Sequence, residues 1–365
     1  MRTPIFAMTV PPNSCRGVTL IELMISLTIG LLLTAVLGYA FLGSRQAFRT
    51  TDTLSRMQES ARYAFERISS DIRMAGFTGC SFSTMANVLN TATDWDKDLF
   101  GFPLVGYEDT ANPTYPNGVS GNVLRGDALT VLRADNSREW VVVHPPGHNA
   151  SAATIPVAPT HNIQPGEILV ITDCRHAAVF QMTGPANIGN NSNQINHTTG
   201  NSTAPGNFTK CFGIGTPSDP MCGSANSQLY TYAPGSRILR LSAATYYIRT
   251  NDAGEPALYR QRLIASGGNA ATTAEEMVEG VQDMQIQYGE NTDGAPGVDT
   301  YVTADGVTNW TNVLSIRISL LMVSLSDESI TTAPQAYTYN GATITPTDRL
   351  LRKAFTTTIS VRNRL

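Results

Sequence analysis

The sequence predicts an α+β protein in which one long N-terminal α-helix packs on an antiparallel β-sheet with large loop insertions. An apolar run begins at Gly17 and continues through Leu42 without a proline. A polar segment that keeps helical spacing follows it, up to Ala75. Beyond this point, β-branched strand patterns alternate with stretches rich in Asn, Thr, Ser, Gly and Pro, which are typical of turns and loops.

The N-terminal helix is predicted from about Thr19 to Ala75, a length of roughly 85 Å at 1.5 Å per residue. Its first part, residues 18–43, is apolar and long enough to cross a bilayer. Its second part, residues 44–76, is amphipathic. Apolar residues recur at Leu54, Met57, Ala61, Ala64, Phe65, Ile68 and Ile72, and the other face holds Arg56, Glu59, Arg62, Glu66, Arg67 and Asp71. Gly76 is a suitable end because glycine readily adopts positive φ.

Glu22 is the only residue of the apolar run that is charged at neutral pH. A carboxylate at the centre of a bilayer costs about 2.5–3.5 kcal/mol, so a sequence keeps one where a partner is available. We therefore interpret Glu22 as a functional residue.

The segment Gly17-Val-Thr-Leu-Ile-Glu22, followed by an apolar helix, resembles the class III leader and N-terminal helix of type IV pilins and pseudopilins. The resemblance implies that residues 1–17 are a leader, that a prepilin peptidase cuts between Gly17 and Val18, and that Val18 is then N-methylated. It also implies that Glu22 helps assembly by facing the N-terminal amine of a neighbouring subunit. A secretory signal peptide with a cleavage site at 38–40 and a plain single-span anchor are the alternatives. Arginines lie on both sides of the run, so the orientation follows from the leader resemblance rather than from charge.

Composition and cysteine count restrict the remaining possibilities. A net charge of −4 with 15% charged residues gives no basic patch of the size that a dedicated nucleic-acid binder needs. Cys80, Cys174, Cys211 and Cys222 remain after the leader, and an even number in an exported domain predicts two disulfides. The short separation favours Cys211 with Cys222, which leaves Cys80 with Cys174, although four cysteines allow three pairings. Zinc is the alternative, but no C-x-x-C spacing occurs.

Strand patterns fill the region after the helix and a loop-rich connector at 77–126. Two hairpins are predicted, 128–133 with 139–143 and 167–172 with 177–182. Residues 184–236 contain few large apolar side chains, so we predict a long surface insertion stapled by Cys211–Cys222. The C-terminal third predicts a strand at 238–250 paired with 257–263, a short helix at 275–284, a strand at 285–288, a central strand at 313–325 and a last strand at 355–361.

The C-terminal third resembles the PilW-type minor pilins over residues 278–288, 313–325 and 351–364. The resemblance therefore covers about the first sixty mature residues and about the last ninety. It implies that residues 77–365 form a periplasmic or extracellular pilin-like β domain. It further implies a minor pilin needed for type IV pilus assembly in a priming or tip complex, hence for twitching motility, adhesion or DNA uptake.

The same resemblance implies the partners and the location. The partners are other minor pilins, the major pilin, the prepilin peptidase and the inner-membrane assembly platform, with a tip adhesin as a further candidate. The protein is expected in the inner membrane as a single-pass protein before assembly, and in the extracellular pilus, at its tip, afterwards. Alternatives are a J-type minor pseudopilin of type II secretion and a tip adhesin or DNA-binding module. For DNA, the basic candidates are Arg349, Arg352, Lys353, Arg362 and Arg364.

Catalytic motifs do not occur, so we predict no enzyme and no cofactor. His144 and His148 flank a Pro-Pro-Gly turn and are expected to be exposed. Cys174 and His176 lie close in sequence, but we assign Cys174 to a disulfide rather than to nucleophilic catalysis. The acidic loop with Glu290, Asp293 and Asp299 is a calcium candidate, although its spacing favours a solvated hairpin tip.

Overall fold

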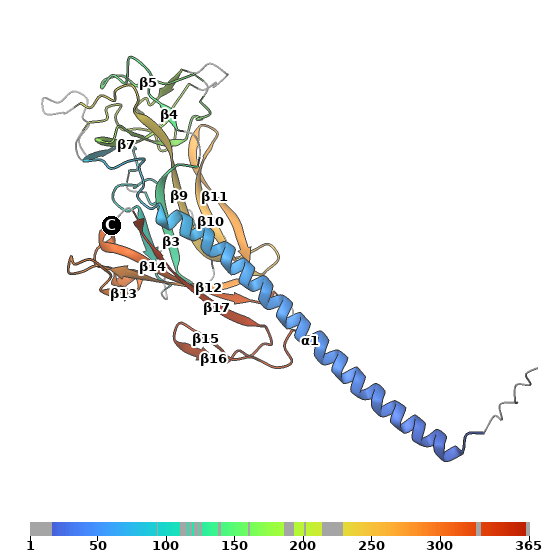
Figure 1. Ribbon diagram of the computed structural model, residues 1–365. Helices are drawn as coiled ribbons and strands as arrows, with labels where there is room; N and C mark the ends of the chain where they lie inside the picture. Colours follow the sequence, from blue (N-terminus) through green and yellow to red (C-terminus); the bar gives the residue numbers. More distant parts are fainter. Residues whose placement is uncertain are drawn as a thin grey trace, which may run out of the picture. The chain divides into compact units, whose positions relative to one another are not determined.

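The long helix α1 runs from Leu20 to Arg73 in the computed structural model (Figure 1). The structure describes residues 17–92, 94–109, 115–116, 119, 123, 126–137, 140–159, 161–185, 193–200, 202–213, 229–325 and 330–362. The chain divides into two compact units, Met1–Asp52 and Thr53–Leu365. The predicted helix is confirmed to within two residues at each end. Gly76 adopts a φ of +74° and its N–H donates to the Leu132 carbonyl at 2.9 Å, so the predicted terminator is confirmed.

The described strands of the second unit form two main sheets. The large sheet has the order β1-β7-β6-β9-β10-β11, with β3 and β4 also on β9 and β2 on β3. Its strands are β1 (Thr84–Asn87), β2 (Leu104–Tyr107), β3 (Ala128–Asp135), β4 (Val141–Val142), β6 (Ile168–Thr172), β7 (His176–Gln181), β9 (Arg237–Thr250), β10 (Pro256–Ser266) and β11 (Asn269–Glu279). Its pairs are antiparallel except β1 with β7.

The small sheet has the order β13-β12-β14-β17 and is antiparallel. Its strands are β12 (Val281–Glu290), β13 (Thr300–Val302), β14 (Val313–Val323) and β17 (Arg352–Ser360), and the short helices η1 (Ala304–Gly306) and η2 (Trp310–Asn312) precede β14. Two short pairs stand apart from both sheets: β5 (Thr154–Pro156) with β8 (Gln194–Asn196), and β15 (Tyr337–Tyr339) with β16 (Ala342–Ile344).

The second half of α1 packs on both sheets and closes the first core of this unit. Its buried residues are Met57, Ala61, Ala64, Ile68 and Ile72, and their spacing of three and four residues forms one apolar stripe. They meet apolar residues of β3, β9, β12 and β14, including Tyr246 and Ile318. The predicted amphipathic face is therefore confirmed, and so are the strands predicted at 238–250, 257–263, 313–325 and 355–361.

One residue of the predicted polar face is buried instead. Asp71 is 3% exposed and accepts a hydrogen bond from Arg133 Nε at 3.1 Å and another from the Tyr246 hydroxyl at 2.7 Å. Arg133 also lies 3.4 Å from Asp135. Helical spacing alone predicted that Asp71 is exposed, because periodicity does not show that Arg133 and Tyr246 of the sheet face this position.

The predicted hairpin 128–133 with 139–143 is wrong, whereas the hairpin of β6 and β7 is confirmed. β3 and β4 do not pair with each other within the described residues, because each pairs with β9, which is long enough to accept both. The helix predicted at 275–284 is also wrong, since these residues belong to β11 and β12. Glu275 there pairs with Arg260 and Arg262 of β10, and this cross-strand pairing outweighs the helical preference of Glu, Ala and Met.

The surface insertion predicted at 184–236 is wrong for its described parts. Ile195, His197, Phe212 and Tyr232 are each fully buried. Ile195, Phe212 and Tyr232 form a second core with residues of β4–β7, among them Phe180, and the His197 ring packs on Phe180 and Phe212. Few large side chains were visible in this stretch, but each aromatic ring buries a large area, so a small number is enough to close a core.

Two histidines lie inside the second core. The His148 and His197 rings are 5.4 Å apart, and His197 stacks on Phe212 at 4.6 Å. Burial lowers the pKa of His148 to about 4 and, with His148 as a neighbour, that of His197 to about 3. The expectation that His148 is exposed is wrong, because it is 1% exposed, whereas His144 is exposed as expected.

We expect replacement of Asp71 by Ala to lower the free energy of unfolding by about 3 kcal/mol, because it leaves the buried Arg133 without its main partner. Thermal or denaturant unfolding of the chain in detergent micelles measures this loss. Glu59→Ala, on the exposed face of the same helix, should change it by less than about 0.5 kcal/mol. Equal losses in the two variants would contradict the role of Asp71.

The buried histidines predict a stability that falls with acidification. Both pKa values are lower in the folded chain than the ordinary 6.5, so the unfolded state binds more protons between about pH 6.5 and 4. Stability is complete above about pH 6.5 and decreases below it. At pH 5 the two groups together should lower the free energy of unfolding by roughly 2–4 kcal/mol relative to pH 7.5.

Unfolding at both pH values in His148→Phe should show about half of this dependence, since one titrating group is removed. His144→Phe, at the exposed neighbouring position, serves as the control and should keep all of it. An unchanged dependence in His148→Phe would show that acid acts elsewhere.

Candidate functional site

The candidate site is the start of α1, where residues 17–19 precede the first helical residue Leu20. The N–H of Thr19 donates to Glu22 Oε2 at 3.2 Å, and its hydroxyl donates to the same oxygen at 3.1 Å. The N–H of Glu22 donates back to Thr19 Oγ1 at 3.3 Å. This reciprocal arrangement is a capping box, which satisfies N–H groups that a helix start otherwise leaves unpaired.

The capping box gives Glu22 a partner inside its own chain. The carboxylate also lies in the first turn, where the helix dipole favours a negative charge. The sequence interpretation considered a partner from a neighbouring subunit and overlooked Thr19. The signal was present, because Thr19-Leu-Ile-Glu22 spells the T-x-x-E pattern before an apolar run.

The predicted cleavage residues Gly17 and Val18 lie outside the helix and are exposed, Val18 by 70%. The capping box begins at the residue that follows Val18. A new N-terminal amine at Val18 would therefore lie next to the Thr19 N–H that already donates to Glu22.

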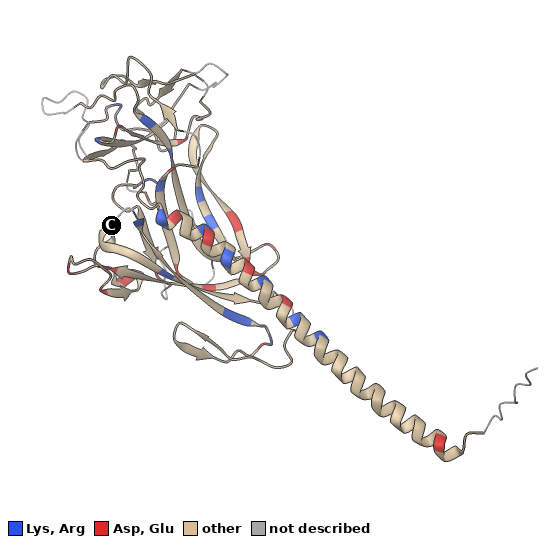
Figure 2. Cartoon of the chain, in the orientation of Figure 1, with Lys and Arg blue, Asp and Glu red and all other residues tan. Residues whose placement is uncertain are grey.

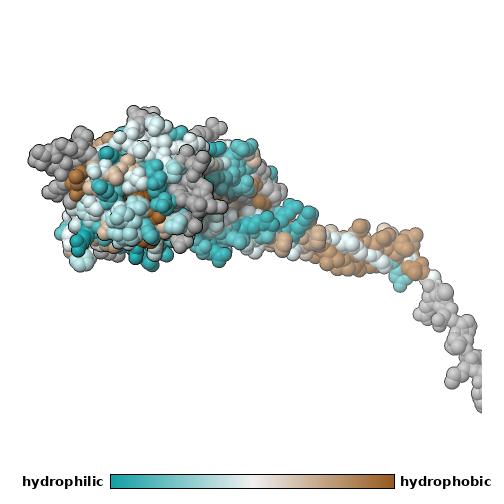
Figure 3. Space-filling model, turned by 90° about the horizontal axis from the view of Figure 1, so that it is seen from above, coloured by the Kyte–Doolittle hydropathy of each residue, from teal (hydrophilic) through white to brown (hydrophobic). Residues whose placement is uncertain are grey.

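The apolar segment after the capping box has no cover within its own unit. Its large side chains from Leu20 to Leu42 are each more than half exposed, and Figure 3 shows them as a brown band over this part of α1. Figure 2 shows that the charged residues of α1 lie along its later half, apart from an acidic position near the start. Among the described residues, α1 is the one helix long and apolar enough to cross a membrane, by length and composition only.

One predicted disulfide is confirmed, between Cys80 and Cys174 with their Cα atoms 5.3 Å apart. It joins the segment after α1 to the turn between β6 and β7 and closes a loop with a sequence separation of 94. Cys211 is 1% exposed, while Cys222 lies outside the described residues, so their pairing stays a prediction. His176, near Cys174, shares a 2.9 Å hydrogen bond with the Thr84 hydroxyl.

The three calcium candidates have different surroundings. Glu290 is 1% exposed and accepts hydrogen bonds from Thr308 and from the Asn309 N–H, the latter at 2.7 Å. Asp299 accepts from the N–H groups of Thr292 and Asp293 at 2.7 and 3.2 Å, which closes the loop on itself. Within the described ranges, no group of three His, Cys, Asp or Glu side chains could hold a metal ion.

The C-terminal basic residues have separate environments, and only Arg352 and Lys353 lie in β17. Arg352 donates to both oxygens of Asp348, at 2.6 and 2.8 Å, and Lys353 is exposed. Arg349 has a hydrogen bond to Thr331 through its carbonyl. Arg362 lies beyond the end of β17, and Arg364 falls outside the described residues.

A long N-terminal helix that joins an exposed apolar segment to an antiparallel sheet domain defines a pilin-like protein. Two sequence families match the chain: the prokaryotic N-terminal methylation motif over residues 12–38, and the type IV pilus-assembly protein W (PilW) over residues 245–363. The matches confirm the resemblance predicted from the sequence and support a PilW-family type IV minor pilin.

The PilW match begins in β9, well before the residue 278 where the sequence resemblance was placed. The matched family is a structural one rather than a known class of enzyme. No curated protein and no solved structure matches the chain.

We expect Thr19→Ala to destabilise the helix start by about 1 kcal/mol, because it removes the cap for the Glu22 N–H. Amide hydrogen exchange over residues 20–23 in micelles should then become about fivefold faster, as 1 kcal/mol implies. Thr28→Ala removes a hydroxyl that bonds only to the Ile25 carbonyl of the same helix, so it is the matched control. Equal exchange at residues 20–23 in the two variants would rule out the capping box.

Proposed function

We propose that the protein is a minor pilin required for type IV pilus assembly and acts in the complex that primes the fibre or forms its tip. The observation that carries the proposal is the N-terminal methylation motif on an exposed apolar helix whose other half is fixed to a sheet domain. The PilW match over residues 245–363 supports a pilus component rather than a plain anchored protein.

The proposed mechanism is assembly rather than turnover. Prepilin peptidase removes residues 1–17 and methylates Val18, while the apolar half of α1 holds the subunit in the inner membrane. On assembly, this half exchanges lipid for the helices of other minor pilins and of the major pilin on the inner-membrane assembly platform. The domain after Thr53 then lies in the periplasm and later outside the cell.

Glu22 has two successive partners in this mechanism. Before assembly, Thr19 shields its carboxylate through the capping box. In the fibre core, the Val18 amine of an adjoining subunit can replace these hydrogen bonds with an ion pair, which is stronger in apolar surroundings. The bonds to Thr19 keep the carboxylate exposed at the first turn of α1, where that amine could reach it.

The size of the second unit supports a place at the tip. The second core is built from residues between 86 and 238, so it adds a large body of chain between the two segments that the families match. A subunit of this size is harder to repeat along a shaft than to place once at an end. Twitching motility, adhesion and DNA uptake would depend on the pilus that this subunit primes.

We expect the wild-type protein to begin with methylated Val18 and Gly17→Leu to keep its leader, because the peptidase needs a small residue at the cut. Mass spectrometry of the purified protein distinguishes the two. Glu22→Ala should be cut normally but should lower the number of surface pili at least about tenfold, since 1.4 kcal/mol lost from an association step corresponds to a factor of ten.

Glu59→Ala is the control for this experiment, because its carboxylate lies on the exposed later half of α1. A wild-type protein that begins at any residue other than Val18 would overturn the cleavage assignment. Normal pilus numbers and twitching in a strain without the protein would overturn the priming role.

A further inference from the structure

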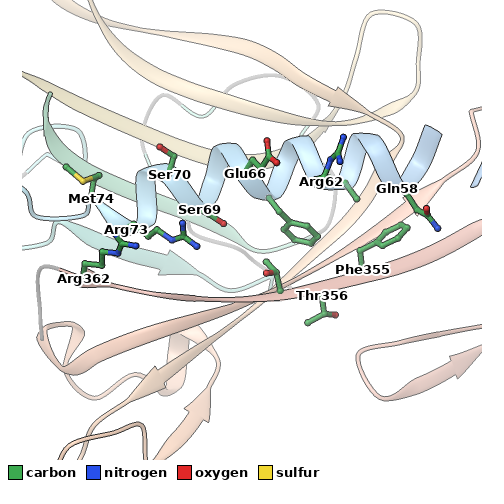
Figure 4. A pocket seen from close by; sticks show the side chains of 13 residues that line it. Gln58, Arg62, Glu66, Ser69, Ser70, Arg73, Met74, Phe355, Thr356 and Arg362 are labelled. Atoms are coloured by element: carbon green, nitrogen blue, oxygen red, sulfur yellow. The ribbon is translucent and has the colours of Figure 1, made fainter. Parts of the chain in front are cut away.

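A groove of about 740 Å³ lies between the later half of α1 and β17 (Figure 4). The helix from Gln58 to Arg73 and the following Met74 supply one wall, and Phe355, Thr356 and Thr357 of β17 supply the other. Arg362 lines the end near Arg73. All of these residues belong to the second unit.

The groove follows the outer edge of β17. Successive side chains of a strand point to opposite faces, so a groove that touches Phe355, Thr356 and Thr357 in turn must run along the edge. β17 is the last strand of the small sheet and pairs only with β14 among the described residues. Its other edge therefore presents unpaired N–H and C=O groups, which can accept another strand.

The groove carries more positive than negative charge. Its charged lining residues are Arg62, Arg73 and Arg362 against Glu66. Within the described part of the chain, these arginines make no ion pair or hydrogen bond. Arg73 and Arg362 both line the groove, and Figure 4 shows them toward the same end of it. An anion bound at this end would therefore be attracted by both guanidinium groups.

The dimensions and the apolar lining fit a short extended peptide. Gln58 to Met74 spans about 24 Å of helix, which equals about seven residues of an extended chain. Phe65 and Phe355 line the groove but are half-buried and pack on the first core. Only part of each ring is therefore exposed to stack on a base, which disfavours single-stranded nucleic acid as the occupant.

We propose that this groove binds an acidic, extended segment of a partner chain, which pairs with the free edge of β17 as an added strand. Main-chain hydrogen bonds along the edge supply affinity. Carboxylates at one end of the segment bind Arg73 and Arg362, and such charge-assisted bonds fix the register. This contact is separate from the assembly function proposed for the start of α1.

The test fuses a candidate strand after Leu365, three residues along the chain from Arg362, which lines the groove. A flexible Gly/Ser linker followed by about seven residues in which Asp alternates with Thr and Val is fused after Leu365. The fusion gives a millimolar effective concentration, so weak binding becomes measurable. Amide hydrogen exchange of β17 should become at least about tenfold slower than in the chain without the extension.

Two controls test whether binding depends on the charge of the fused strand and on the arginines of the groove. The same extension with Lys in place of Asp should leave exchange in β17 unchanged. Arg73→Glu and, separately, Arg362→Glu should abolish the slowing caused by the acidic strand, whereas Arg175→Glu, at an exposed position outside the groove, should keep it.

Equal slowing by the Lys strand, or no slowing by the Asp strand, would overturn the proposal. Slower exchange in β17 when single-stranded oligothymidylate is added to the chain without an extension would also overturn it, in favour of nucleic acid.

Discussion

The second unit depends on the buried carboxylate of Asp71, which fixes the helix to the large sheet. Its two oxygens bind different strands, Arg133 of β3 and Tyr246 of β9. An apolar stripe alone tolerates sliding by one turn, because i and i+4 positions present similar faces. A buried charge does not, since a shift of one turn would leave Asp71 and Arg133 unpaired in the core. The apolar contacts thus stabilise the packing, while the ion pair specifies its register.

The helix α1 has two different environments along its length. Up to Leu42 its large side chains are exposed and apolar, whereas from Met57 onward one face is buried and the other is charged. The first part is long and apolar enough to cross a membrane, by length and composition. The sheets cover the second part, where Asp71 and its neighbours fix the helix to the domain.

The parts of the fold that sequence predicts are those set by local periodicity. α1, β9 with β10, and β14 each show a long and uniform pattern, and their predicted positions are confirmed. The helix predicted at 275–284 failed because Glu275 is stabilised by arginines of β10, which lie close only after the sheet forms. Which strands pair also depends on residues far apart in the sequence. For this reason the prediction paired β3 with β4, whereas each pairs with β9.

The candidate site was predicted more completely than the second core. Gly17, Val18 and Glu22 form a short motif with fixed spacing, and Thr19 was missed although it lies inside the motif. His148 could not be found in this way, because its burial depends on Phe212 and Tyr232, far along the chain. Residues 184–236 have a loop-like composition overall. An average over this stretch gives little weight to the few aromatic residues that close the core.

The shape of the groove and its charge come from different parts of the chain. β17 lies inside the PilW match at 245–363, whereas the helical wall of the groove lies between the two matched segments. A sheet that ends at β17 beside a long helix gives a free edge and a groove, whichever side chains the helix carries. Arg62 and Arg73 come from the unmatched helical segment and supply most of the positive charge. The capacity to accept a strand would then follow from the architecture that the matched segment builds, and the preference for an acidic strand from the helix of this particular chain.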